Sequence, residues 1–312
     1  MTRGHITLMR GMMIGSNPAL RPIVAALAGI ALFSAMDVAI KAAALVVGAY
    51  SAYFLRGVIG LVLIGPVWWW RERRWPTGAV FRLHLLRGTV VTFMGLTFFL
   101  SLVRLPLAQA IAISFIAPLI ALYLAAIILK EVIRPSAIIA ALFGLAGVVV
   151  IVGGKIMGEA MDDDAVIGLI AIFASALLYA WNLVLQRQQA MVARPAEVSA
   201  FQNGVAVVIL GVAAPFLLQM PAPQQWAEIA VGAALAVGAA LLLAWAYARA
   251  EAQVLVPIEY SGFLWAALLS WLYLGERVTL ATFAGAVLIV IGCWIGTRQP
   301  RRQSPRPEQS AV

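Results

Sequence analysis

Ten apolar runs, each long enough to cross a lipid bilayer, follow one another along the 312-residue chain. A spanning helix needs roughly 20 apolar residues, because the hydrocarbon layer is about 30 Å thick and a helix rises about 1.5 Å per residue. The runs cover residues 23–47, 49–70, 84–103, 107–129, 136–153, 165–186, 198–219, 227–248, 254–274 and 279–297. No connection between them can hold a folded soluble domain, so the sequence predicts an all-α polytopic membrane protein with ten transmembrane helices.

Composition supports this prediction. Hydrophobic residues make up 63% of the chain and charged residues 11%, against about 45–50% and about 25% in ordinary soluble domains. Such a surplus of apolar side chains requires that lipid solvates most of the outer surface. The net charge of +9 does not indicate nucleic-acid binding, because the basic residues fall in short connections rather than on one folded surface.

The distribution of Lys and Arg predicts the orientation of the chain. With the N-terminus inside, the inner connections and tails hold sixteen of these residues and the outer connections hold three. Because basic residues accumulate on the cytoplasmic side of membrane proteins, both termini are expected to be cytoplasmic.

A weak internal repeat divides the spans into two groups of five. A shift of 145 residues places Glu131 on Glu276, each at the end of a span, and a shift of 141 places Ser34 on Ser175. Since five is odd, the second group must enter the membrane in the opposite sense, which predicts two inverted five-helix repeats. Inverted repeats are typical of alternating-access transporters. The expected organisation is a cytoplasmic tail (1–22), two repeats (23–153 and 165–297) and a disordered cytoplasmic tail (298–312).

Asp37 and Lys41 lie one helical turn apart inside the first apolar run. An ionised group at that depth costs about 2.5–3.5 kcal/mol, so it needs a partner, water or a function. Residue counting places Arg56 at a similar depth in the second run, in the outer half of the bilayer. Two hypotheses are open. Asp37 and Lys41 either pair with each other and merely permit insertion, or Lys41 and Arg56 contact an anionic group of a substrate. Asp37 then holds Lys41 in place or exchanges a proton.

Further candidates lie in other spans. Arg87 and Glu259, near the inner boundary, either extend to the interface or form a cytoplasmic gate. Trp181 beside Asn182, and Tyr260 beside Glu259, are expected to contribute to a small-molecule site, because such sites combine aromatic walls with a few polar groups. Two glycine pairs have the spacing of close helix packing: Gly57 with Gly60, and Gly144 with Gly147.

Motifs for catalysis and cofactors are missing from the sequence. There is no Gly-x-Ser-x-Gly, no His-Glu-x-x-His and no phosphate-binding Gly-x-x-x-x-Gly-Lys-Ser/Thr. The two histidines are too few for a dedicated metal site, and the single cysteine, Cys293, excludes an internal disulfide. We therefore expect a protein that is not an enzyme, has no cofactor or metal, and takes its energy from a gradient.

Motifs that carry a family resemblance are spread over residues 23–297. They are Phe33-Ser-Ala-Met-Asp37 through Lys41, Arg56, Leu85-Leu86-Arg87-Gly88, Ser114-Phe-Ile-Ala-Pro118-Leu119, Leu129-Lys-Glu131, Ile258-Glu259-Tyr260 and Leu274-Gly-Glu276. In these residues the chain resembles ten-span members of the drug/metabolite transporter superfamily, which are built from two EamA-type domains. The resemblance implies the inverted-repeat fold and transport of metabolites or drugs, with many relatives acting as exporters.

The expected function is secondary active transport of small polar or amphipathic metabolites across a bacterial inner membrane by alternating access. Export and proton coupling are hypotheses. Three buried positive charges against two negative ones favour an anionic or zwitterionic substrate. A cationic multidrug/proton antiporter is the main alternative, and an integral-membrane enzyme, a lipid-handling protein, a channel and a receptor are others. The expected partners are a small-molecule substrate, the lipid bilayer and protons, without nucleic acid, for a monomer or homodimer.

Overall fold

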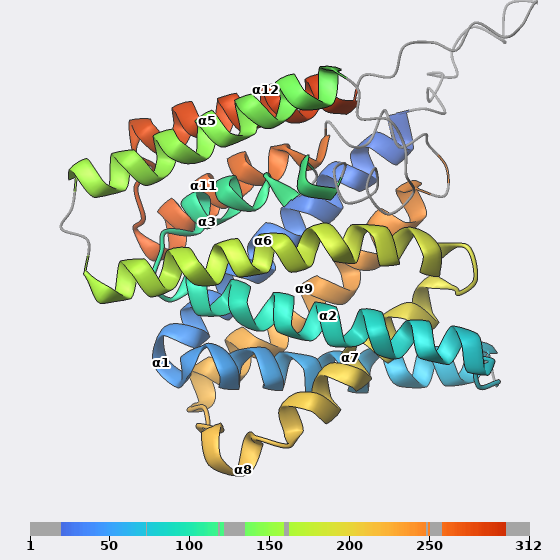
Figure 1. Cartoon of the computed structure of the whole chain (residues 1–312). Helices are drawn as coiled ribbons and strands as arrows, with labels where there is room; N and C mark the ends of the chain where they lie inside the picture. The colour runs from blue at the N-terminus through green and yellow to red at the C-terminus, as the bar shows by residue number, and fades with distance from the viewer. Residues whose placement is uncertain are drawn as a thin grey trace, which may run out of the picture.

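The computed structural model describes residues 20–72, 74–117, 119–121, 135–158, 162–247, 249 and 258–297. All regular structure in these residues is helical (Figure 1). The helices are α1 Leu20–Glu72, α2 Gly78–Leu102, α3 Leu107–Ser114, α5 Pro135–Gly158, α6 Asp163–Ala190, α7 Pro195–Gly211, α8 Ala214–Leu217, α9 Pro223–Tyr247, α11 Ser261–Leu274 and α12 Leu280–Thr297. The predicted tails, apart from residues 20–22, and Glu131 lie outside the described residues.

Helix α1 contains the first two predicted spans. It is interrupted at Gly48, which has φ 79° and ψ 152°. This backbone conformation is readily adopted only by glycine, since a Cβ atom makes positive φ costly. The chain therefore reverses there, and α1 forms two arms, residues 20–47 and 49–72 (Figure 1). The predicted boundary between the first two spans is confirmed.

Four of the described helices are long and apolar enough to cross a membrane: α1, α2, α6 and α9. The remaining apolar helical segments are shorter. The predicted seventh span, 198–219, is not one continuous helix. Helix α7 ends at Gly211, and a separate short helix, α8, follows. Pro215 accounts for this break, since it has no amide hydrogen to continue the helical hydrogen bonding.

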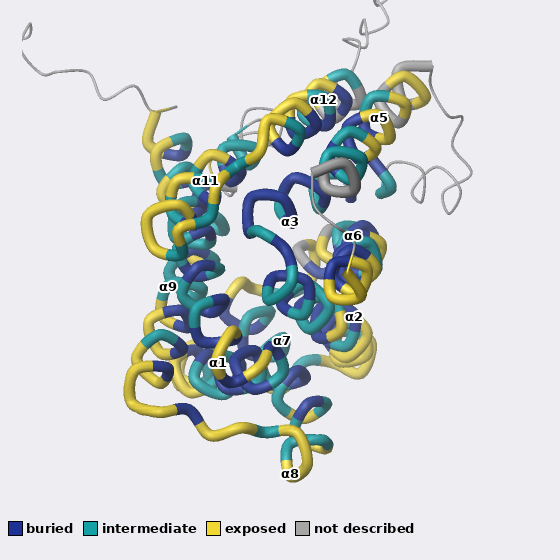
Figure 2. Tube along the Cα trace, turned by 90° about the vertical axis from the view of Figure 1, so that its left-hand side faces the viewer, coloured by how far each residue is buried: buried dark blue, intermediate teal, exposed yellow. Residues whose placement is uncertain are grey.

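The helices pack in a pattern that is preserved when the two repeats are exchanged. The first arm of α1 packs on α9, and its counterpart α6 packs on α2, the counterpart of α9. The second arm of α1 packs on α7, α3 on α11 and α5 on α12, and each of these pairs maps onto itself. This is the arrangement of two inverted five-helix repeats related by a pseudo-twofold axis. Figure 2 shows α3 buried inside the bundle, with exposed residues on the outward sides of the surrounding helices.

Both predicted glycine pairs lie at helix contacts. A methyl group on Gly60 would lie 2.8 Å from the side-chain oxygen of Asn203 in α7. One on Gly147 would lie 2.6 Å from the carbonyl oxygen of Gly285 in α12. The backbones of α5 and α12 therefore approach closely at a pair of small residues, as is common between membrane helices. The interpretation of these glycines as packing positions is confirmed.

We expect Gly147→Leu to separate α5 from α12, since the added side chain meets backbone that cannot move aside. Overpacking of this kind costs about 1–3 kcal/mol, which thermal unfolding of the purified protein in detergent would register as a lower melting temperature. Gly153→Leu, on the same helix, is the matched control because nothing lies within 4 Å of its Cβ position. Equal melting temperatures for the two variants would contradict this packing.

Candidate functional site

The first arm of α1 directs a polar stripe toward α11. Ser34, Asp37 and Lys41 recur at spacings of three and four residues, which places them on one face of the helix. The hydroxyl of Ser34 donates a hydrogen bond to the carbonyl oxygen of Gly262, at 3.3 Å. Lys41 forms an ion pair with Glu276, just beyond the end of α11. Asp37 lies between these two contacts, so it faces the helical bundle rather than lipid.

The amine of Lys41 is held at the junction of three parts of the chain. In addition to its ion pair with Glu276, it donates to the carbonyl oxygen of Leu105, at 2.6 Å. The second carboxylate oxygen of Glu276 accepts from the amide of Leu107, at 2.8 Å. The Lys41 side chain is 3% exposed and that of Glu276 is 19% exposed. We call these four residues the outer closure, after the side on which the orientation predicted from Lys and Arg places them.

The end of α11 explains why Glu276 reaches α1. Gly275 has φ 69°, the left-handed conformation that commonly ends a helix. Its amide donates to the carbonyl of Trp271, and the amide of Glu276 donates to that of Ser270, both at 3.2 Å. The turn directs Glu276 back toward the first repeat. Glu276 was absent from the predicted site residues, although the repeat had already singled it out.

Lys41 does not form an ion pair with Asp37, which was one of the two hypotheses for these residues. Within the described part of the chain, Asp37 has neither a hydrogen bond nor an ion pair, and the charge that acts on it is that of Arg56. The Arg56 guanidinium lies over the rings of Tyr53, at 5.0 Å, and Phe99, at 5.9 Å. Among the described residues, its Nε is buried without a hydrogen-bond partner. Asp37 and Arg56, from the two arms of α1, therefore keep unused hydrogen-bonding capacity inside the bundle.

A second buried polar group connects α2 with α6 and α7. Ser175, Asn182 and Gln189 recur every seven residues, so they share the face of α6 that packs on α2. Arg87 donates through Nε to Asn182 Oδ1, at 2.9 Å, and through Nη1 to Gln189 Oε1, at 2.5 Å. Ser175 donates to the carbonyl of Met94, at 3.0 Å. Sequence analysis identified Arg87 and Asn182 separately but did not pair them.

His84 extends this group to α7. Its Nδ1 lies 2.5 Å from Nε2 of Gln189, and its Nε2 lies 2.7 Å from a carboxylate oxygen of Glu197. The ring of Phe201 stacks on the imidazole, with centroids 4.5 Å apart and planes inclined by 15°. We call Asn182, Arg87, Gln189, His84 and Glu197 the inner network, again after the predicted orientation. Neither His84, Gln189 nor Glu197 was among the predicted site residues, and the histidines were considered only as metal ligands.

The remaining predicted residues are distributed differently. Arg87 forms no ion pair with Glu259 among the described residues, since its contacts go to α6, whereas Glu259 acts electrostatically on Tyr179. Tyr260 packs edge-on against Phe115, with ring centroids 5.2 Å apart. Trp181 is 44% exposed and lies on the outward face of α6, so the structure does not bring it to the other candidates.

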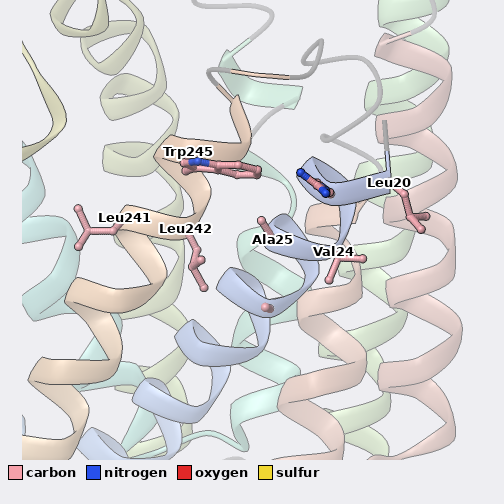
Figure 3. A pocket seen from close by; sticks show the side chains of 8 residues that line it. Leu20, Val24, Ala25, Leu241, Leu242 and Trp245 are labelled. Carbon is pink, nitrogen blue, oxygen red and sulfur yellow. The ribbon is translucent and has the colours of Figure 1, made fainter. Parts of the chain in front are cut away.

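Two hollows accompany these groups. A polar pocket of about 170 Å³ lies over the outer closure and includes Glu276, Gln109 and Thr279 in its lining. A groove of about 670 Å³ lies between α1 and α9 and is lined mainly by apolar residues such as Leu20, Leu241 and Trp245 (Figure 3). None of the predicted site residues lines either hollow. The polar pocket adjoins the outer closure through Glu276.

Comparison with known proteins gives consistent results. The model of the EamA-like transporter family matches residues 20–153 and 166–297. An uncharacterized transporter of Helicobacter pylori strain J99 is 28% identical over 241 residues, which cover 74% of this chain and 78% of the relative. Its counterpart in strain 26695 is 28% identical over 239 residues, with the same coverage. A crystal structure of a chain that is 21% identical superposes with a TM-score of 0.62, covering 88% of this chain and 96% of its own.

The two family matches cover most of the chain, one for each half, and the solved structure has the same fold. The predicted all-α fold of ten transmembrane helices in two inverted repeats is confirmed. The two Helicobacter pylori relatives, which are similar in sequence to this chain, are named as transporters. The chain belongs to the EamA-like transporter family and is a multi-pass membrane transporter.

Proposed function

We propose that this transporter is a secondary active exporter of small anionic or zwitterionic metabolites, working by alternating access in the bacterial cytoplasmic membrane with both termini inside. The observation that carries the proposal is the outer closure. Its ion pair joins Lys41 of the first repeat to Glu276 of the second, directly above Asp37 on the same helix face. An ion pair between two repeats that move against each other must break when that side opens.

The charges of the site fit this substrate class. In the closed arrangement Glu276 neutralises Lys41, and Asp37 offsets Arg56. When the outer side opens, Glu276 moves away with the second repeat, and Lys41 and Arg56 then face Asp37. Two cations and one anion suit a carboxylate-bearing solute, whose carboxylate replaces Glu276. An amino group on the same solute can bind Asp37.

The rings near Arg56 complete the site. Tyr53 and Phe99 lie against each other, with centroids 5.4 Å apart, and support the guanidinium. Phe115, just after α3, and Tyr260, just before α11, form a second aromatic pair. Small-molecule sites commonly combine such apolar walls with a few charged groups.

Exchange of cationic drugs for protons is a second candidate, and one observation favours it. The ammonium of Lys41 is held by Glu276 rather than by Asp37, so Asp37 retains a carboxylate that is able to bind a cation. The Arg56 charge that acts on Asp37 favours the first candidate instead. The two proposals differ in the charge of the solute that competes for Asp37.

Ligand-dependent thermal stabilisation of the purified protein separates these candidates. We expect amino acids or organic acids, rather than cationic drugs, to raise the melting temperature. Lys41→Ala and Asp37→Asn should weaken binding by roughly 10- to 150-fold, since a charge-assisted hydrogen bond contributes about 1.5–3 kcal/mol. Trp181→Ala, on the outward face of α6, should bind normally. A ligand that stabilises Lys41→Ala and Asp37→Asn as well as the parent would contradict the site.

The outer closure also makes a prediction about stability. Glu276→Gln leaves the ammonium of Lys41 buried without a counter-charge, a loss that typically costs about 3–5 kcal/mol. We expect a marked drop in melting temperature.

Asp164→Asn is the matched control, because it removes an outer carboxylate whose side chain is 73% exposed and bonded to Arg104 at 3.2 Å. Such surface pairs contribute about 0–1 kcal/mol. If both substitutions lowered the melting temperature by the same small amount, the Lys41 ion pair would not stabilise the closed state.

Proton coupling through Asp37 can be measured in proteoliposomes with an imposed pH gradient and a solute identified by thermal stabilisation. We expect the gradient to drive solute flux in the parent and to have no effect in Asp37→Asn. A parent flux that is indifferent to the gradient would show that transport is not coupled to protons.

A further inference from the structure

Hydrogen-bond directions in the inner network follow from the chemistry of its members. A guanidinium carries only donors, so the atom of Gln189 that faces Arg87 must be the amide oxygen. That contact is 2.5 Å long. The amide nitrogen of Gln189 must then face His84, where it lies 2.5 Å from Nδ1. Because this nitrogen can only donate, Nδ1 must be the acceptor and carries no hydrogen.

The other ring nitrogen is determined by the same reasoning. Nε2 of His84 lies 2.7 Å from a carboxylate oxygen of Glu197, which accepts. His84 is thus a neutral imidazole with its hydrogen on Nε2. Four hydrogen bonds run without conflict from Asn182 through Arg87, Gln189 and His84 to Glu197.

A second proton on the His84 ring has only one nitrogen available. It must bind Nδ1, where the amide group of Gln189 already points a donor. Rotating the Gln189 amide relieves that conflict but turns its nitrogen toward Arg87, again donor against donor. A single amide cannot serve a protonated His84 and Arg87 together, so Gln189 transmits the protonation state of one to the other.

The surroundings allow His84 to accept this proton. Glu197 on α7 is the acidic group in contact with the ring, and it stabilises an imidazolium as an ion pair. Arg87, one helical turn along α2, opposes the added charge, and α6 contributes the Gln189 amide. The His84 residue is 1% exposed and Glu197 is 9% exposed, and Phe201 covers the ring. Glu197 therefore supports the charged ring, whereas Gln189 and Arg87 are arranged for the neutral one.

We propose that Nδ1 of His84 is a proton-binding site of this transporter and that the Gln189 amide couples its occupancy to Arg87. When His84 takes up a proton, Arg87 loses its Gln189 acceptor and keeps only Asn182. One of its two side-chain bonds between α2 and α6 is then broken, which frees Arg87 for another acceptor. The consequence for transport rests on the proposed function, whereas protonation and coupling do not require it.

Histidine NMR of the full-length protein in lipid nanodiscs tests the site directly. The chain has two histidines, so ¹³C,¹⁵N-histidine labelling of a His5→Gln background leaves only the His84 signals. At neutral pH we expect the neutral tautomer with hydrogen on Nε2, and conversion to imidazolium on acidification. A neutral ring with its hydrogen on Nδ1, or a ring that stays neutral on acidification, would overturn the proposal.

Gln189→Glu tests the coupling with a nearly isosteric change. A carboxylate accepts from Arg87 and His84 at once, so His84 should become doubly protonated at the same neutral pH. Gln188→Glu, at the adjacent exposed position, adds the same charge and should leave the parent tautomer. An unchanged tautomer in Gln189→Glu would refute the role of Gln189.

If Gln189→Glu does not fold, a second variant tests the same coupling. Arg87→Gln removes the donor that fixes the Gln189 amide, so the amide oxygen can turn to Nδ1 while Glu197 still accepts from Nε2. At the same acidic pH, the imidazolium fraction of His84 should then exceed that of the parent. Equal fractions in Arg87→Gln and the parent would contradict the coupling. If the proposed transport function is wrong, no ligand will stabilise the protein, but the histidine spectra will still be as expected. The two proposals can therefore fail separately.

Discussion

The contacts between the two repeats depend on how one buried ammonium group, that of Lys41 in the first transmembrane helix, is neutralised. Lys41 cannot remain charged inside the membrane without a counter-charge and a full set of acceptors. The structure supplies them from the opposite repeat, through Glu276, and from the turn before α3, through the carbonyl of Leu105. One electrostatic requirement therefore holds the first arm of α1, α3 and α11 together at the outer end. Under the proposed function, a solute that offers another carboxylate breaks the same interaction.

The pseudo-twofold packing gives the two buried polar groups different roles. The outer closure connects the first repeat to the second at the end where they separate in the proposed alternating-access mechanism. The inner network also crosses between repeats, but it runs along the extensive α2–α6 contact, the counterpart of the α1–α9 contact. A bond within such a contact is suited to sensing, because one altered hydrogen bond changes the contact without opening it. The fold thus separates a proposed gate from a proposed proton sensor.

The pattern of apolar residues was sufficient to predict the fold, but it could not predict which residues the buried charges contact. The apolar runs identified ten spans, and the spacing of Gly147 correctly indicated close packing. The partners of Lys41 and Arg87 were missed because they lie 235 and 95–102 residues away along the chain, and no local pattern encodes such contacts. Trp181 and Asn182, which were predicted to share a site, lie on different faces of α6. Adjacent residues in a helix point about 100° apart, so sequence neighbours need not share a site.

The distance across the outer closure is the most direct test of its role as a gate. Spin labels on cysteines at Val103 and Arg277, in a Cys293→Ser background, lie on the two turns that the closure joins. Double electron–electron resonance should give one short distance in the parent and a substantial longer-distance population in Glu276→Gln, with Asp164→Asn resembling the parent. An identical distance distribution in Glu276→Gln and the parent would contradict the claim that the Lys41–Glu276 ion pair holds the outer side closed.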